Sequence, residues 1–317
     1  PSMTTLYYPP VPYAAEPLQP SDRCVATIGF FDGVHRGHRF LIDALKQEAQ
    51  RRSRQSMVIT FDRHPRQVLQ PQWHPQLLTT LEEKTNLLKE TGIDVLVILH
   101  FDAQMAQLSA RDFMQQVLQE RLGADVLLTG YDNRFGHNRE EGFDDYVRFG
   151  KEIGMDVVCA KPLAEDGQCF SSSLVRRMLT EGRVEETTRC LGRPYQLTGS
   201  VVHGERIGRT LGFPTANLQL HDDCRMVPAN GVYAVQVSWE QNPIPRPGMM
   251  NIGTRPTFDG HCQTLEVHLF DFSGNLYGHQ LRIDFIAHLR QEQHFDSPEA
   301  LTRQMEQDAQ QARHILL

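Results

Sequence analysis

The sequence lacks the features that mark membrane, exported and zinc-binding proteins. No apolar run approaches the roughly 20 residues that a transmembrane helix needs. The N-terminal stretch has neither the basic segment nor the apolar core of a secretory signal peptide. None of the six cysteines forms a C-x-x-C pair, so neither a disulfide framework nor a zinc site is indicated. We therefore predict a cytoplasmic protein with reduced thiols.

A basic excess is also missing. Lys and Arg number 32 against 39 Asp and Glu, which gives a net charge of −7. General binders of nucleic acids or anionic membranes normally carry a positive surplus, so neither partner is expected. What is present is an ordinary globular composition, with 40% hydrophobic and 22% charged residues. The length of 317 residues corresponds to about two domains. A weak homo-oligomer is left open.

Strand-like and helix-like segments alternate from Cys24 to about Gly182. The strand-like segments are almost continuously apolar, as in a parallel sheet that helices cover on both faces. Ligands of such sheets bind at the carboxyl ends of the strands. One helix should begin at Thr80, with Glu83 completing a capping box, and end at Gly92. The predicted strands are 24–31, 55–61, 94–101, 124–130 and 155–162, and the predicted helices are 40–52, 80–92, 109–123 and 142–154.

After Tyr195 the pattern changes to short strands separated by glycine, proline and asparagine turns. That spacing predicts an antiparallel barrel or sandwich. A long last helix should follow, with Ser297 as its N-cap and Pro298 at its first position. Because the pattern changes within residues 181–195, we predict one domain over residues 1–186 and a second over 187–317. The predicted strands of the second domain are 196–204, 231–240, 247–253, 264–272 and 279–289.

The stretch IGFFDGVHRGHR, residues 28–39, connects the first predicted strand to a helix. The amides at a helix N-terminus attract phosphate. His35 and His38 are three residues apart, so they share one helix face and can both donate to phosphoryl oxygens, and Gly37 lets a ligand approach the backbone. From the residues alone, a pair of solvated surface histidines or a metal site is also open.

This stretch resembles the G-x-F-D-G-x-H-x-G-H signature of the nucleotidylyltransferase superfamily, in its flavin-nucleotide branch. Residues 60–65, TFDRHP, 129–136, TGYDNRFG, and 171–176, SSSLVR, resemble three further motifs of that branch. The resemblance implies a Rossmann-like domain that transfers an adenylyl group from ATP to FMN, with His35 and His38 as catalytic residues. It further implies that Gly29, Phe30, Asp32, Gly33, His35, Gly37, His38, Ser172 and Arg176 bind ATP, and that Asp62 and Asp132 bind the flavin.

Adenylyl transfer suits this set of residues. The FMN phosphate is already ionised, so it needs no general base to attack the α-phosphorus of ATP. Catalysis then consists of positioning the two substrates and stabilising the charge that develops as pyrophosphate leaves.

A second candidate functional motif is GERIGRTLGFPTAN, residues 204–217. Three glycines, two arginines and hydroxyl groups can wrap a polyanion with backbone amides. The stretch is not a Walker A loop, because the G-K-[ST] ending is absent. Taken alone, it is equally consistent with an irregular connection between strands.

This loop resembles the signature of riboflavin kinases, and the motifs at 231–233, 251–257, 265–272 and 289–292 follow in that family's order. The resemblance implies that Thr215 and Asn217 hold Mg²⁺ and the ATP phosphates, since a hard cation prefers oxygen ligands. Glu266 is the implied catalytic base for the riboflavin hydroxyl, although a solvated glutamate on a strand is the alternative. Arg290 is the implied flavin contact. The implied ATP-binding residues are Gly204, Gly208, Thr210, Gly212, Pro214, Thr215 and Asn217.

Together these resemblances cover nearly the whole chain and imply a bifunctional riboflavin kinase and FAD synthetase. Its small-molecule partners would be riboflavin, FMN, FAD and ATP, with Mg²⁺ as the cofactor. Two alternatives stay open: an adenylyl- or cytidylyltransferase for another phosphate, with the barrel as a binding module, and a flavin-binding or regulatory protein without turnover.

Overall fold

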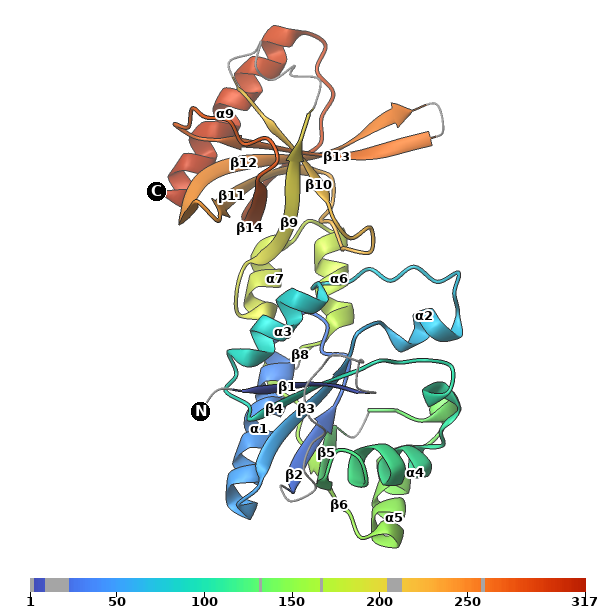
Figure 1. Ribbon diagram of the computed structural model, residues 1–317. Coiled ribbons are helices and arrows are strands. Elements are labelled where there is room, and N and C mark those ends of the chain that lie inside the picture. The colour runs from blue at the N-terminus through green and yellow to red at the C-terminus, as the bar shows by residue number, and fades with distance from the viewer. Residues whose placement is uncertain (1–2, 9–22, 131–132, 166–167, 204–212, 258–259) are drawn as a thin grey trace. The chain divides into compact units, whose positions relative to one another are not determined.

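The computed structural model describes residues 3–8, 23–130, 133–165, 168–203, 213–257 and 260–317. The chain divides into two compact units, a first unit at Pro1–Ser171 and a second unit at Ser172–Leu317. Among the described residues, none of the helices has both the length and the apolar character needed to cross a membrane. Figure 1 colours the chain from the N-terminus to the C-terminus.

The first unit is built on a six-stranded sheet in the order β1-β4-β3-β2-β5-β6, in which all neighbours are parallel. The order reverses at β2, which has β3 on one side and β5 on the other. Ligands of such sheets bind where the strand order reverses, outside the carboxyl ends of the strands. The strands are β1 (Thr4–Tyr8), β2 (Cys24–Ile28), β3 (Gln55–Phe61), β4 (Val95–Leu99), β5 (Ala124–Gly130) and β6 (Asp156–Ala160).

Helices cover both faces of this sheet (Figure 1), because its strands bury side chains on both sides. On one face Val25 and Val58 pack with residues of α1 and α3. On the other face Ala26 and Met57 pack with residues of α4, η2 and α5. The helical segments are α1 (Arg36–Arg52), α2 (Pro65–Leu69), α3 (Leu81–Lys89), η1 (Met105–Gln107), α4 (Ala110–Asp112), η2 (Phe113–Gln119), η3 (His137–Arg139) and α5 (Phe143–Ile153), and the pair β7 (Ala164–Glu165) and β8 (Gln168–Cys169) follows β6.

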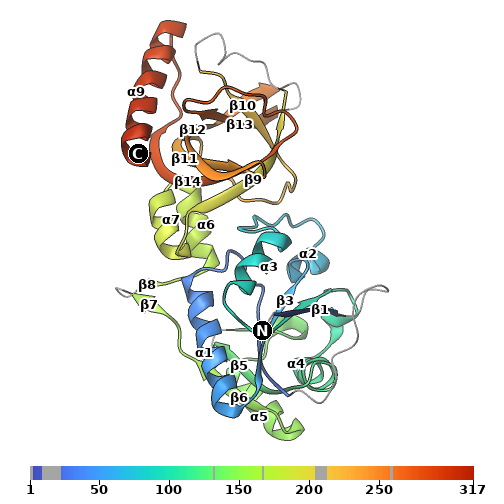
Figure 2. The same ribbon diagram turned by 60° about the vertical axis from the view of Figure 1, so that its left-hand side comes forward.

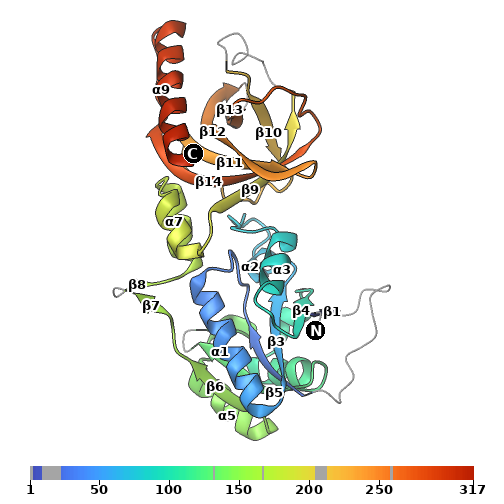
Figure 3. The same cartoon turned by 90° about the vertical axis from the view of Figure 1, so that its left-hand side faces the viewer.

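The second unit contains a closed antiparallel barrel in the order β10-β13-β12-β11-β14-β9. The long helix α9 lies along the outside of the barrel in Figure 2 and Figure 3, and its Ala312 packs against Val232 and Met249. The elements are α6 (Ser172–Thr180), α7 (Val184–Leu191), β9 (Tyr195–Val202), β10 (Ala216–Leu220), β11 (Gly231–Trp239), β12 (Asn242–Thr257), β13 (Gly260–Leu269), β14 (Gln280–Gln291) and α9 (Pro298–Leu316).

The predicted fold class is confirmed: a parallel α/β sheet precedes an antiparallel barrel and a long last helix. The predicted caps are present. Thr80 Oγ1 accepts a hydrogen bond from Glu83 N at 3.1 Å, and Thr80 N donates to Glu83 Oε2 at 2.9 Å. Ser297 Oγ accepts from Ala300 N at 3.1 Å at the start of α9.

Several elements differ from the prediction, among them β10, α2 and α6, which were not predicted. Strand β1 was not expected, because its five residues are partly exposed at the edge of the sheet and show no continuous apolar run. The single helix predicted over 109–123 is instead a short α-helical turn, α4, followed by the π-helical segment η2. The side-chain pattern predicts a helical segment here but does not encode its hydrogen-bond register.

Candidate functional site

The turn between β2 and α1 is tightly wound. Phe31, Gly33 and Val34 have positive φ angles of 54°, 79° and 39°, and such conformations are concentrated at functional sites when non-glycine residues adopt them. Gly29 N donates to the Ile59 carbonyl at 3.0 Å, and Val34 N donates to the Phe31 carbonyl at 3.1 Å. These bonds hold the first turn of α1 at the carboxyl edge of the sheet, beside the point where the strand order reverses.

Asp32 stabilises this turn through hydrogen bonds. The residue is 3% exposed, and its carboxylate accepts hydrogen bonds from Leu78 N at 3.0 Å, from Thr79 N at 3.2 Å and from Thr79 Oγ1 at 3.2 Å. Thr79 Oγ1 in turn accepts from Gly33 N at 3.2 Å. The carboxylate therefore joins the turn to the segment before α3, and its predicted contact with ATP stays a prediction.

His35 and His38 lie together at the start of α1. Their rings stack with centroids 3.6 Å apart, and His35 Nδ1 accepts a hydrogen bond from His38 N at 3.3 Å as the N-cap of the helix. Burial lowers the pKa of His38 well below its usual value, and the charges of His35 and Lys84 lower it further, so the ring is neutral at neutral pH. In the described part of the chain, the buried Nδ1 of His38 has no hydrogen-bond partner. Two solvated surface histidines do not fit this burial.

Lys84, in α3, is a candidate that the motifs did not reveal. The residue is 3% exposed, and its Nζ donates to the Phe30 carbonyl at 3.1 Å and to the Phe61 carbonyl at 3.0 Å. Nζ also lies 4.0 Å from the centroid of the Phe30 ring. Burial lowers the pKa of Lys84 to about 8, against the raising effect of Asp32 and Asp62. The sequence offers no signal for this role, since Lys84 stands on an otherwise ordinary helix.

Asp62, at the end of β3, contacts His100, at the end of β4. His100 Nδ1 donates to Asp62 Oδ2 at 2.6 Å, and Phe101 N donates to Oδ1 at 3.4 Å. The His100 side chain is 45% exposed, so this pair lies at the surface of the carboxyl edge. His100 is a second candidate that sequence reasoning missed, and a histidine directly after an apolar strand was its only signal.

The loop after β5 makes polar contacts both to the sheet and to helix α5. Asn133 Nδ2 donates to the Ile28 carbonyl at 2.9 Å, which joins this loop to the end of β2. Phe135 N donates to the Tyr146 hydroxyl at 2.9 Å, and the two rings stack. Asp132, the predicted flavin contact of this loop, lies outside the described residues.

The chain returns to the start of α1 just before the first unit ends. The Arg36 guanidinium lies 4.9 Å from the centroid of the Phe170 ring, and a Cβ on Gly37 would be 3.1 Å from the Phe170 carbonyl oxygen. Gly37 therefore leaves room for this close approach. Ser172 and Arg176 follow at the start of α6, in the second unit, four residues apart and so on one helix face. Their predicted contact with ATP stays a prediction.

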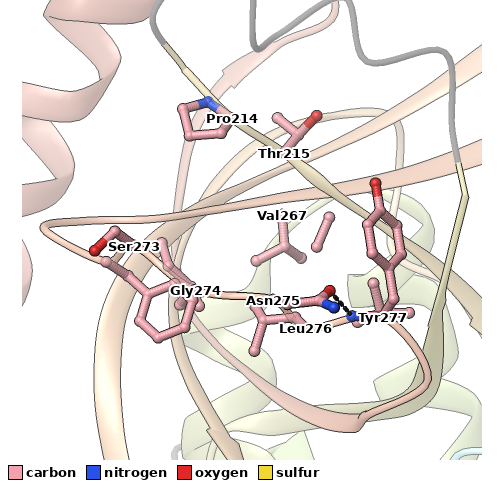
Figure 4. Close-up of a pocket in the computed structure, with 12 residues that line it drawn as sticks. Pro214, Thr215, Val267, Ser273, Gly274, Asn275, Leu276 and Tyr277 are labelled. Atoms are coloured by element: carbon pink, nitrogen blue, oxygen red, sulfur yellow. Dashed lines mark hydrogen bonds between the residues drawn. The ribbon is translucent and has the colours of Figure 1, made fainter.

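Two cavities in the second unit are lined by predicted site residues, and the larger of these two has a volume of about 610 Å³. Figure 4 shows Thr215 above Val267, with Tyr277 on one side and Ser273 on the other. Tyr277 N donates to Asn275 Oδ1 at 3.0 Å, which shapes the segment that joins β13 to β14. The lining residues are Val201, Pro214, Thr215, Ala216, Val267, Leu269, Phe272, Ser273, Gly274, Asn275, Leu276 and Tyr277.

The smaller cavity has a volume of about 360 Å³ and contains Glu266 in its lining. Strand β13 separates the two cavities, because Val267 lines the larger one while Glu266 and His268 line the smaller one. Thr215 lines both. The lining residues of the smaller cavity are Thr215, Val232, Met249, Asn251, Thr254, Thr264, Glu266, His268, Arg290, Glu292, Gln293, Phe295, Leu301, Met305 and Asp308.

Glu266 lies in one layer of the barrel wall with two asparagines. It pairs in register with Asn217 on β10 and with Asn251 on β12. The neighbouring Leu265 and Val267 are buried, so the side chain of Glu266 lies on the opposite face of β13 from these two. The register therefore brings the predicted metal-binding and basic residues, Asn217 and Glu266, side by side.

Arg290 is part of a buried ion pair. Its Nε donates to both carboxylate oxygens of Asp308 at 3.0 Å, and its second terminal nitrogen donates to Asp308 Oδ2 at 2.8 Å. The two side chains are 16% and 3% exposed. Gln304 Nε2 also donates to Asp308, at 3.0 Å. The predicted flavin contact is thus fixed by α9 at the edge of the smaller cavity.

Pro214 and His268 hold the chain that enters β10. His268 Nδ1 donates to the Pro214 carbonyl at 2.8 Å, and burial is the main cause that lowers the pKa of His268. The predicted phosphate-binding residues Gly204, Gly208, Thr210 and Gly212 lie outside the described residues. In the described ranges, no group of three or more His, Cys, Asp or Glu side chains is arranged to hold a metal ion.

Comparisons with known proteins match each unit separately and the chain as a whole. Residues 18–174 match the family model of FAD synthetase, and residues 191–316 match that of riboflavin kinase. The chain is 40% identical over 297 residues to the bifunctional riboflavin kinase/FMN adenylyltransferase of Escherichia coli K12, covering 93% of this chain and 94% of that protein. It is 36% identical over 298 residues to the protein of the same description from Bacillus subtilis, covering 92% of each.

A solved structure shares the architecture of the chain. It is described as a macrolide-efflux protein from Streptococcus pneumoniae, with a TM-score of 0.86 and 30% identity over 98% of this chain and 99% of that one. The efflux activity in this description is attributed to the Streptococcus pneumoniae protein. What the two chains share is the order and fold of both units.

Proposed function

Because the chain belongs to the family of bifunctional riboflavin kinase/FMN adenylyltransferases, we propose that each of its two reactions has its own set of residues. Riboflavin and ATP give FMN and ADP in the riboflavin kinase domain. FMN and ATP then give FAD and pyrophosphate in the FAD synthetase domain. The two family models and the bifunctional relatives favour this function over a transferase for another phosphate and over a protein without turnover.

In the barrel, we assign ATP to the larger cavity and riboflavin to the smaller one. The observation that carries this assignment is that β13 separates the cavities while Thr215 lines both. A γ-phosphoryl group beside Thr215 then faces a hydroxyl in the smaller cavity. Positioning donor and acceptor in this way supplies much of the rate of a phosphoryl transfer.

Glu266 is the proposed general base of the kinase. As the primary hydroxyl oxygen of riboflavin forms its bond to the γ-phosphorus, the bond from that phosphorus to the ADP oxygen breaks. The hydroxyl proton passes to the Glu266 carboxylate. Glu266 lines the smaller cavity, next in register to Asn217, which fits a residue that faces the acceptor rather than the nucleotide.

Mg²⁺ is the proposed metal of the kinase site. The Thr215 hydroxyl and the Asn217 side-chain oxygen are ligands of the kind that a hard cation prefers, and Mg²⁺ usually keeps several waters in addition. When bound, the ion would neutralise phosphate charge during transfer. Thr215 and Asn217 would hold it where the two cavities meet.

In the first unit, we assign the ATP phosphates to the turn between β2 and α1. Its backbone amides and the positive end of the α1 dipole favour an anion, and the neutral His38 ring can donate one N–H to a phosphoryl oxygen. His35 holds His38 through the stacked rings and its bond to the His38 amide. Ser172 and Arg176, at the start of α6, stay proposed ATP-binding residues.

The FMN side of the adenylyl site is proposed to include Asp62 and Asp132. The bond between Asp62 and His100 fixes the orientation of the His100 ring and leaves its other nitrogen for a ligand. Attack of an FMN phosphate oxygen on the α-phosphorus breaks the bond to the pyrophosphate oxygen. No proton needs to be removed in that step.

One experiment tests this proposal directly. The protein is incubated with riboflavin, ATP and Mg²⁺, and the flavins are separated by chromatography over time. We expect FMN to appear first and FAD to follow. The assignment is wrong if neither accumulates, and FMN without FAD would contradict the adenylyl half alone.

Three expectations from the sequence stay predictions. They are a functional boundary between residues 186 and 187, a location in the cytoplasm and a weak homo-oligomer. The boundary of the compact units falls earlier, after Ser171, because α6 and α7 group with the barrel.

A further inference from the structure

The proposed reactions assign no role to Lys84. This residue nevertheless connects the two segments of the first unit that are proposed to bind the substrates. Phe30 belongs to the turn that precedes α1, and Phe61 ends β3 directly before Asp62. The Lys84 Nζ donates to the carbonyl oxygens of both, at 3.1 and 3.0 Å. A single ammonium therefore links the proposed nucleotide turn to the proposed flavin segment.

Burying this charge costs free energy, so its retention needs compensation. The charge is compensated by the two hydrogen bonds to carbonyl oxygens and by the face of the Phe30 ring, whose centroid lies 4.0 Å away. The negative charges of Asp32 and Asp62 also stabilise it. The positive charge of Lys84 also lowers the pKa of His38, the proposed phosphate-binding histidine, so the protonation states of these two residues are coupled. Among the described residues, the charged or titratable groups that interact with Lys84 are Asp32 in the turn, Asp62 after β3 and His38 on α1, and Glu83 precedes it on its own helix.

We propose that Lys84 is a positioning residue for FMN adenylylation, whose ammonium fixes the nucleotide turn against the end of β3 so that ATP and FMN meet in reactive alignment. The inference rests on the proposed assignment of this reaction to the first unit. Lys84 itself acts through the two carbonyl groups and need not touch either substrate. Small displacements of bound reactants are enough to explain a large effect, because a shift of about 1 Å can cost about 100-fold in rate.

The first test compares Lys84→Met with Lys89→Met, an exposed lysine on the same helix. Each variant removes one positive charge from α3. We expect Lys84→Met to lower kcat for FMN adenylylation by about 10- to 100-fold, with KM for ATP and FMN within threefold of the unmodified protein. Lys89→Met should be unchanged. Riboflavin phosphorylation by the same chains is the internal reference and should stay constant in both.

The second test uses pH and does not depend on Lys84→Met folding. The Lys84 pKa of about 8 means that the ammonium is charged below pH 8 and is lost as pH rises through 8 to 9. The ratio of the adenylylation rate to the kinase rate should fall over this range. In Lys84→Arg, whose guanidinium stays charged, that fall should disappear.

Distinct outcomes separate this inference from the proposed function. If the unmodified protein makes no FAD, or if His38→Ala makes it at the full rate, the assignment of the site fails. If the site holds but folded Lys84→Met adenylylates FMN within twofold of the unmodified rate, the positioning role of Lys84 is overturned. A fall with pH that is the same in Lys84→Arg as in the unmodified protein overturns it as well, because the arginine stays charged over this range.

Discussion

At the scale of single residues, Glu266 should distinguish the two reactions. Glu266→Gln keeps the side-chain shape in the smaller cavity but cannot accept the proton of the riboflavin hydroxyl. Loss of a general base typically costs about 10²- to 10⁴-fold, so riboflavin phosphorylation should fall by that factor. Supplied FMN should still be converted to FAD at the full rate. Chromatography of both reactions measures this.

The matched control is Glu240→Gln, an exposed glutamate directly after β11. It should leave both rates unchanged. Equal loss of both activities in Glu266→Gln would contradict a role confined to the barrel.

His38 should give the opposite result. Its neutral ring donates to phosphate that becomes more negative in the transition state, and loss of one such donor costs about 10²- to 10³-fold. His38→Ala should therefore stop the reaction at FMN. Riboflavin phosphorylation should continue unchanged. His314→Ala, which changes an exposed histidine of α9, is the control, and full FAD formation by His38→Ala would exclude His38 from the site.

The residues that the sequence could predict are those that stand in local motifs. His35, His38 and Glu266 are spaced by a helix turn or by the alternation of a strand, and the structure places them on those elements. Lys84 and His100 could not be predicted in this way. Their contacts exist because β3 lies between β2 and β4 in the sheet, an order that no short stretch encodes.

At the scale of elements, apolar runs and caps were sufficient for most of the fold. Buried strands such as β2 and β4 are continuous apolar runs, and the start of α3 has a complete capping box. The edge strand β1 lacks such a run. Strand order and barrel closure depend on contacts between distant segments, so the sequence could predict a barrel or sandwich without deciding between them.

The ion pair between α9 and β14 provides a test at this scale. Asp308→Asn leaves the buried Arg290 guanidinium without its counter-charge, which should cost about 3 kcal/mol of unfolding free energy. For a unit of this size, Tm should fall by roughly 10 °C. Differential scanning calorimetry measures it, with riboflavin affinity as a second readout because both residues line the smaller cavity.

Asp271→Asn is the matched control for this pair. Asp271 also bonds an arginine of α9, Arg313, but its side chain is 78% exposed. Solvent screens such a pair, so Tm should barely change. If both variants shift Tm equally, burial is not the reason why the Arg290 pair stabilises α9.

At the scale of the whole molecule, the product of one domain is the substrate of the other. FMN carries a charged phosphate and is freely soluble, so nothing requires it to stay with the chain that made it. Glu266→Gln cannot make FMN but keeps the adenylyl site, and His38→Ala keeps the kinase site. Neither variant alone should form FAD from riboflavin. An equimolar mixture should do so after a lag, because FMN released by one chain binds to the other. The lag should shorten as the concentration of both proteins rises. If the mixture makes FMN without FAD while the unmodified protein makes both, transfer within one chain is obligatory and the two sites are not independent.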